Sequence, residues 1–288
     1  MLEDAQPTKE FTDFWNEVLA PKFIRFRHVL VDGLSGHSDR AFGSLEISEG
    51  ERIVDVGCGF GDTAIELGQR VGPSGYVLGI DCCEKFLEIA RTDAQTADAR
   101  NVEFVAGDAQ DFSFPGNFDF CFARFGAMFF ESPVAGLRNM RTALKPGGRM
   151  MLLVWRTIDD NAWFKIPKET VLKFLPPPGD DARSCGPGPL SMANQEMVTG
   201  QLVIAGYHDI EFQRIDSPVT VGRDADDAME FQLTLGPAGE VFREAGDEAL
   251  QKEADIKSAL GEELSHFSIE DGSIVMNSSS WMITARNP

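Results

Sequence analysis

Three glycines at alternate positions, Gly57, Gly59 and Gly61, separate a short apolar run from a helix-forming stretch. Glycine has no Cβ to block a bound molecule, and it adopts positive φ angles without strain. A helix that starts directly after such a turn offers unpaired N–H groups and the positive end of its dipole. The pattern predicts a loop whose backbone closely approaches a ligand, although a tight turn can also require glycine for structure alone.

The spacing of these glycines distinguishes between ligand classes. A dinucleotide-binding turn has the pattern G-x-G-x-x-G, whereas here Gly61 follows Gly59 by two positions and Asp62 stands where the third glycine belongs. A P-loop is excluded because no Gly-Lys-Ser/Thr sequence follows. The loop is therefore a poor match for a nicotinamide, a flavin or a nucleoside triphosphate.

Acidic residues follow two further apolar runs. Asp81 ends the run 75–81, and Asp108 follows the run 102–105; two more strand-like runs span 118–123 and 149–155. Helix-length segments separate the runs, which predicts an α/β fold with a doubly wound, mostly parallel sheet. At the carboxyl edge of such a sheet, Asp81 is placed to accept hydrogen bonds from a ribose.

Together these motifs resemble the class I S-adenosylmethionine-dependent methyltransferases, and within them the quinone-methylase-like group. The resemblance covers about residues 45–156 and includes the turn 144–149 before the fifth strand. It implies a Rossmann-like sheet of seven strands, the last one reversed at 280–286. It also implies S-adenosyl-L-methionine as cofactor and S-adenosyl-L-homocysteine as product.

The resemblance assigns roles to several residues of a cofactor site. Asp81 would accept both ribose hydroxyls, Asp108 would contact the adenine amino group, and Gly57 and Gly59 would admit the methionine part. Asp55 would either contact the cofactor or hold the loop through backbone N–H groups. The predicted cofactor-binding set is Asp55, Gly57, Gly59, Gly61, Asp81, Cys82, Asp108, Ala109 and Arg124.

Arg124 has several interpretations within this set. It could form an ion pair with Asp108 or Asp119, bind an acid group of the acceptor, or anchor its own loop. Structural anchoring is favoured.

The segment 124–130 after the fourth strand faces the transferred methyl group in similar enzymes. Its residues Phe125, Met128 and Phe129, with Trp15 from the N-terminal segment, predict an acceptor pocket for a flat apolar molecule. Methyl transfer mainly needs orientation and exclusion of water, so no metal is expected. His28 and His266 are the candidates for a general base, although each histidine also suits a surface or structural role.

The domain prediction has four parts. Residues 1–44 form an N-terminal helical lid, with one or two helices broken at Pro21, and residues 45–220 form the cofactor-binding α/β core. Residues 221–272 form a helical insertion, with helices at 225–235 and 238–264, that serves as a pocket wall or a dimer contact. Residues 273–288 contribute the final strand of the core sheet.

Composition limits the partners. The net charge of −20, without a basic cluster, argues against nucleic acid and anionic membrane surfaces. No apolar stretch is long enough to span a bilayer, the acidic start at 1–4 is unlike a signal peptide, and the five cysteines lack metal-type spacing. A cytoplasmic protein with a small-molecule acceptor, as a monomer or a homodimer, is expected.

The predicted function is methyl transfer to oxygen or carbon of a small apolar acceptor of aromatic or quinol-like type. Two alternatives stay open: N-methylation of a small amine, which Glu131 or the acidic insertion would favour, and a non-catalytic protein that binds the S-adenosyl ligand.

Overall fold

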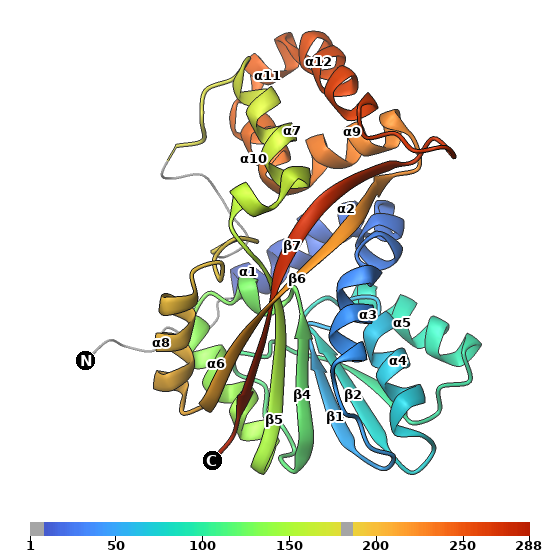
Figure 1. Cartoon of the computed structure of the whole chain (residues 1–288), viewed down its shortest axis with the longest axis vertical. Helices are drawn as coiled ribbons and strands as arrows, with labels where there is room; N and C mark the ends of the chain where they lie inside the picture. Colours follow the sequence, from blue (N-terminus) through green and yellow to red (C-terminus); the bar gives the residue numbers. More distant parts are fainter. Residues whose placement is uncertain (1–8, 180–186) are drawn as a thin grey trace.

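The computed structural model describes residues 9–179 and 187–288, so the acidic start at 1–4 and Cys185 lie outside the described residues. A seven-stranded sheet forms the centre of the molecule (Figure 1). Its strands are β1 (Arg52–Val56), β2 (Tyr76–Asp81), β3 (Val102–Ala106), β4 (Phe118–Arg124), β5 (Leu144–Trp155), β6 (His208–Gly222) and β7 (Ile274–Arg286). Their order in the sheet is β3-β2-β1-β4-β5-β7-β6.

The sheet confirms the predicted fold class. Strands β1 to β5 pair in parallel, and β7 runs antiparallel between β5 and β6. The strands β1, β2 and β4 are buried on both faces along most of their length, as expected where helices cover both sides of a parallel sheet. One face is covered by α3 (Ser35–Gly43), α4 (Asp62–Val71) and α5 (Glu84–Thr96), and the other by α6 (Pro133–Ala143) and α8 (Gln195–Ala205).

The N-terminal segment is not broken at Pro21. Helix α1 (Lys9–Phe14) continues through a π-helical turn, η1 (Trp15–Leu19), into α2 (Ala20–Arg25), and a second π-helical turn, η2 (Val29–Gly33), precedes α3. Pro21 stands in the first turn of α2, directly after η1. The predicted break was wrong, because the backbone stays helical through Leu19 and Ala20.

Four helices lie between β6 and β7, where the sequence predicted two. They are α9 (Ala225–Thr234), α10 (Gly236–Glu244), α11 (Asp247–Gln251) and α12 (Glu253–Ser265). The predicted single helix at 238–264 was wrong, because Gly246 adopts φ +54° after α10 and Lys252 separates α11 from α12. These helices pack with α7 (Ala162–Leu172) into a helical cap above the carboxyl edge of the sheet (Figure 1).

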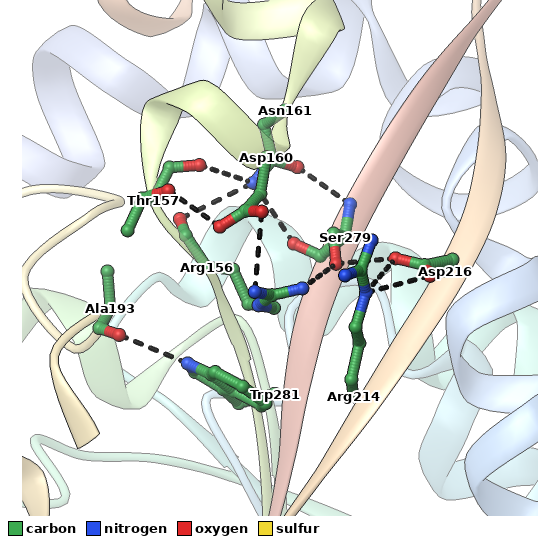
Figure 2. A network of polar contacts seen from close by, with 9 residues as sticks. All are labelled: Arg156, Thr157, Asp160, Asn161, Ala193, Arg214, Asp216, Ser279 and Trp281. Carbon is green, nitrogen blue, oxygen red and sulfur yellow. Dashed lines mark hydrogen bonds and ion pairs between the residues drawn. The ribbon is translucent and has the colours of Figure 1, made fainter.

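Strand β6 pairs with β7 along nearly its whole length and carries the chain up to the helical cap. At the base of the helical cap, a polar network joins the end of β5 to this hairpin (Figure 2). Arg156 forms an ion pair with Asp160 at 3.3 Å and lies over the Trp281 ring at 4.4 Å. The network fixes the direction in which α7 leaves the sheet.

Asn161 is the fully buried member of this network. Its Nδ2 donates to the carbonyl oxygens of Arg156, Thr157 and Ser279, and its Oδ1 accepts from the Ser279 N–H at 2.9 Å (Figure 2). The same Oδ1 also accepts from the Trp163 Nε1–H at 3.3 Å. We expect Asn161→Ala to lower the free energy of unfolding by about 3 kcal/mol, because these buried groups lose their partner. Urea denaturation measures this, with the exposed Asp159→Asn as control. Equal stability of the two variants would contradict the proposed anchoring.

Candidate active site

The glycine loop connects β1 to α4, and its three glycines are required for different reasons. Gly57, Gly59 and Gly61 all have positive φ angles, of +66°, +53° and +78°. A Cβ on Gly59 would meet no atom within 4 Å, whereas one on Gly61 would come within 2.8 Å of Ala90 and 2.7 Å of Phe104. Gly59 thus faces a cavity, and Gly61 permits close packing between α4, α5 and β3.

That cavity, called here the glycine-loop cavity, lies at the carboxyl edge of β1 to β4. Its walls include seven of the nine predicted cofactor-binding residues: Gly57, Gly59, Asp81, Cys82, Asp108, Ala109 and Arg124. Asp55 and Gly61 are not part of the walls. The structure therefore brings together residues from four strand ends that are far apart in the sequence.

Asp81 is the central carboxylate of this cavity. It accepts the backbone N–H groups of Gly59 and Cys83, each at 2.9 Å. Burial raises the pKa of Asp81 to about 6, and these two hydrogen bonds oppose the rise. The side chain keeps lone pairs available for a ligand, because each carboxylate oxygen can accept more than one hydrogen bond.

Asp108 lies at the end of the neighbouring strand. Its Oδ1 accepts the backbone N–H of Gln110 at 2.9 Å, and the Gln110 side chain also donates to it. Burial raises the pKa of Asp108. Two desolvated carboxylates in one cavity favour a ligand that brings hydrogen-bond donors or positive charge.

Asp55 lies beneath the loop rather than in the cavity. Its Oδ2 accepts the Thr63 hydroxyl at 2.7 Å, while its Oδ1 has no partner among the described residues. Burial raises the pKa of Asp55 to about 7. The contact with Thr63 ties the end of β1 to the first turn of α4, so Asp55 holds the loop through a side chain and not through backbone N–H groups.

Arg124 combines anchoring with a place in the cavity wall. Its guanidinium donates to Asp62 at 2.6 Å and to the Ser38 hydroxyl at 2.8 Å. Its partner is therefore neither Asp108 nor Asp119, the two carboxylates that the sequence suggested. The contacts join β4 to α3 and α4, and they neutralise the arginine within an acidic cavity.

A second, larger cavity of about 720 Å³ lies between the sheet edge and the helical cap, and is called here the aromatic cavity. It shares five wall residues with the glycine-loop cavity: Phe23, Leu30, Leu34, Phe125 and Phe129. The two cavities are therefore adjacent, and these apolar side chains belong to the walls of both.

The predicted acceptor residues are divided between the two cavities. Phe125 and Phe129 line both, Met128 lines only the aromatic cavity, and Trp15 lines only the glycine-loop cavity. Phe125 adopts φ +55°, a conformation that costs a non-glycine residue about 1–2 kcal/mol. Its N–H bonds to the Leu153 carbonyl at 2.8 Å, and its ring stacks on Trp155 with centroids 3.9 Å apart. Backbone strain of this kind is typical of functional sites.

The two candidate base histidines do not reach either cavity. His28 bonds to Asp227 of α9 at 2.7 Å, and His266 is exposed at the end of α12. His37 is buried between Ser278 and Ser280, and burial lowers its pKa to about 4. No histidine among residues 9–179 and 187–288 lines the walls, so the geometry gives His28 a structural contact between the N-terminal segment and the helical cap.

Several wall residues of the aromatic cavity were not predicted from the sequence. They are Trp155, Trp163, Phe164, Phe231 and Gln232, with the cations Lys22, Lys168 and Arg243. Trp155 is the last residue of the fifth strand, and this position at the carboxyl edge of the sheet could have identified it as a cavity residue. The others lie on helices whose apolar spacing resembles that of ordinary core helices.

The strand order with a reversed β7, and the glycine loop after β1, define the class I, Rossmann-like methyltransferase fold. Residues 53–148 match the model of a family described as Methyltransferase domain. Demethylmenaquinone methyltransferase of Listeria welshimeri is 36% identical over 140 residues, which cover 46% of this chain and 59% of that protein. The enzyme of the same name from Staphylococcus aureus is 37% identical over 115 residues, or 40% of this chain and 47% of that protein.

Solved structures show the same fold. The YcgJ protein of Bacillus subtilis has a TM-score of 0.56 at 17% identity, covering 88% of this chain and 98% of that one. Phosphoethanolamine N-methyltransferase 2 of Haemonchus contortus, in complex with S-adenosylhomocysteine and phosphomonomethylethanolamine, has a TM-score of 0.58 at 19% identity, covering 96% and 60%.

Residues 53–148 are therefore similar to a methyltransferase domain, and the sheet has the class I, Rossmann-like methyltransferase fold that the resemblance implied. The matched segments span about half the length of the curated relatives. In the described part of the chain, every helix is too short or too polar to cross a membrane.

Proposed function

We propose that this protein transfers the methyl group of S-adenosylmethionine to oxygen or carbon of a small apolar acceptor of aromatic or quinol-like type. The observation that carries the proposal is the wall shared by the two cavities, with Phe125 and Phe129 bordering both. A cofactor at the glycine loop and a flat molecule in the aromatic cavity would then meet across these rings. The names of the demethylmenaquinone methyltransferases that the chain resembles support an acceptor of this type.

The glycine-loop cavity fits this cofactor. Gly59 leaves open space where a side chain would stand, and Asp81 and Asp108 offer acceptors for the ribose and the adenine amino group. The buried Nε1–H of Trp15, in the wall of the same cavity, lacks a partner among the described residues and would donate to the ligand. The cofactor, when bound, supplies an electrophilic methyl group on a positively charged sulfur.

The protein contributes orientation and a dry environment. Methyl transfer is an in-line displacement, for which aligned reactants and excluded water supply much of the rate enhancement. Phe125, Phe129 and Trp155 would hold the plane of the acceptor against the shared wall. No described histidine lines the cavities, so the proposed acceptor is itself a competent nucleophile, such as a phenol that ionises readily or an electron-rich ring carbon.

The amine alternative receives less support from the geometry. Glu131 is exposed and lies in neither cavity wall, so it is not placed to hold an ammonium group. Among the described wall residues of the aromatic cavity, Glu240 is the sole carboxylate. We therefore favour oxygen or carbon as the methylated atom.

The direct test combines a binding and a turnover measurement. Isothermal titration calorimetry should show binding of S-adenosylhomocysteine, and a panel of phenols, quinols and amines should then be assayed for its release from S-adenosylmethionine. Turnover with phenols or quinols supports the proposal, whereas turnover with amines alone contradicts it. Tight binding without turnover on any compound would favour the non-catalytic alternative.

Binding of S-adenosylhomocysteine should weaken in acid. The ribose hydroxyls donate to ionised Asp81, whose pKa is raised to about 6, so protonation below that pH removes an acceptor. We expect the dissociation constant to rise about tenfold from about pH 7 to about pH 5. Calorimetry at these two pH values measures the change, and an unchanged constant would contradict the role of Asp81.

The same carboxyl group has the opposite effect on the ligand-free fold. Its pKa in the fold lies above the ordinary value of 3.8, so folded protein retains a proton that unfolded protein releases. The contribution of Asp81 to the free energy of unfolding therefore falls as the pH rises from about 4 to about 6.

A further inference from the structure

The aromatic cavity contains cations that the proposed apolar acceptor does not explain. The chain carries a net charge of −20, yet Lys22 of α2, Lys168 of α7 and Arg243 of α10 all contribute to the wall of this one cavity. The three residues come from separate elements and converge only through the tertiary fold. None of them lines the glycine-loop cavity.

Two of these cations have no counter-ion in the described structure. Within residues 9–179 and 187–288, no ion pair forms with Lys22 or Lys168, although most other lysines of the described chain have one. Burial lowers the pKa of Lys22, and the charge of Arg243 lowers it further. The charged form of Lys22 is therefore destabilised by partial loss of solvation and by repulsion from Arg243. Neither effect acts on an isolated, solvated surface lysine.

Arg243 and Glu240 complete the charged part of the wall. Arg243 pairs with the neighbouring Glu244 at 3.1 Å, and Glu240 contributes one carboxylate. Among the described residues, the wall thus contains three cations against one anion, in a protein with nearly twice as many acidic as basic residues.

Gln232 of α9 gives an independent indication of a ligand. Its side chain is 1% exposed and lines the aromatic cavity, and its Nε2 has no hydrogen-bond partner in the described structure. An unpaired buried amide donor costs about 1–3 kcal/mol, so a ligand oxygen that accepts from it would recover this energy. The donor and the three cations are complementary to the same chemical group.

We propose that the acceptor carries an oxyanion, a carboxylate or a phosphate, which Lys22, Lys168 and the Gln232 amide bind in the aromatic cavity. This inference rests on the proposed function and refines it, because it changes the acceptor class from a neutral apolar molecule to a flat apolar acid. The acid group would bind away from the shared wall, so that the nucleophilic end of the molecule points toward Phe125 and the cofactor. Charge-assisted hydrogen bonds are about twice as strong as neutral ones, so they would select acids over neutral analogues.

The test compares oxyanion and neutral probes on the same protein. The protein saturated with S-adenosylhomocysteine is titrated by calorimetry with 4-hydroxycinnamate, with phenyl phosphate and with neutral 4-ethylphenol. We expect one of the two anions to bind about tenfold or more tightly than 4-ethylphenol, and the preferred anion distinguishes a carboxylate from a phosphate acceptor. Equal or tighter binding of 4-ethylphenol, or no binding of either anion, would overturn the proposal.

Substitutions then identify the side chains that bind the anion. Lys22→Met, Lys168→Met and Gln232→Leu should each weaken the preferred anion about tenfold while affinity for 4-ethylphenol and S-adenosylhomocysteine stays within about twofold. Lys165→Met is the matched control on α7, because Lys165 pairs with Asp159 and lines neither cavity. An anion affinity that none of the three variants changes would overturn the assignment.

If the wild-type protein does not bind S-adenosylhomocysteine, the proposed function itself is refuted. The two failures are therefore distinguishable in one set of titrations.

Discussion

Asp81→Asn is expected to weaken S-adenosylhomocysteine binding by about 100-fold or more, which corresponds to about 2.7 kcal/mol. The substitution removes the negative charge that would accept the ribose hydroxyls. It also replaces one oxygen by an NH₂ group, which cannot accept the N–H of Gly59 or Cys83 that now bonds there at 2.9 Å. The loop and the ligand thus lose the same acceptor, and hydrogen bonds to charged groups are worth about 1.5–3 kcal/mol each.

Calorimetry with S-adenosylhomocysteine measures this effect directly. Glu103→Gln is the matched control, because Glu103 lies on the next strand and is exposed, with its carboxylate bonded to Tyr76. The control should bind within about twofold of wild type. An Asp81→Asn protein that also binds within twofold would show that this carboxylate does not hold the cofactor.

The predictable parts of the fold are those that short segments of the sequence determine. The glycine loop, the apolar strands β1 to β5 and the carboxylates Asp81 and Asp108 each follow from residues close together in the sequence. Parallel strands end at one edge of their sheet, so this local information also places the carboxylates beside the loop. The glycine-loop cavity was therefore largely predictable, and the reversed β7 followed from the order of strands in the family that the sequence resembles.

The aromatic cavity was less predictable because its wall is made by tertiary packing. Trp163 and Lys168 lie on α7, Gln232 on α9 and Arg243 on α10, and no spacing rule brings these residues together. Apolar residues on such helices can face a cavity or the core with the same periodicity. His28 shows the converse, since its position within the predicted lid suggested chemistry, whereas in the structure it contacts Asp227.

A pair of glycine substitutions should separate binding from folding within the same loop. Gly59→Val is expected to weaken S-adenosylhomocysteine binding by about 100-fold or more, because its side chain would occupy open space in the cavity. The positive φ of Gly59 adds a strain of about 1–2 kcal/mol, which a folded protein of this size can tolerate. The cavity at Gly59 is thus the direct cause of the expected loss.

Gly61→Ala should have the opposite profile. Its Cβ would meet the Phe104 ring and Ala90 at 2.7 and 2.8 Å, so α4 must move away from its neighbours. Overpacking and the positive φ together should lower the free energy of unfolding by about 3 kcal/mol or more. Denaturant titration and calorimetry on both variants measure the two effects. If Gly61→Ala is as stable as wild type but loses binding, Gly61 contacts the cofactor after all, and the division of roles within this loop is wrong.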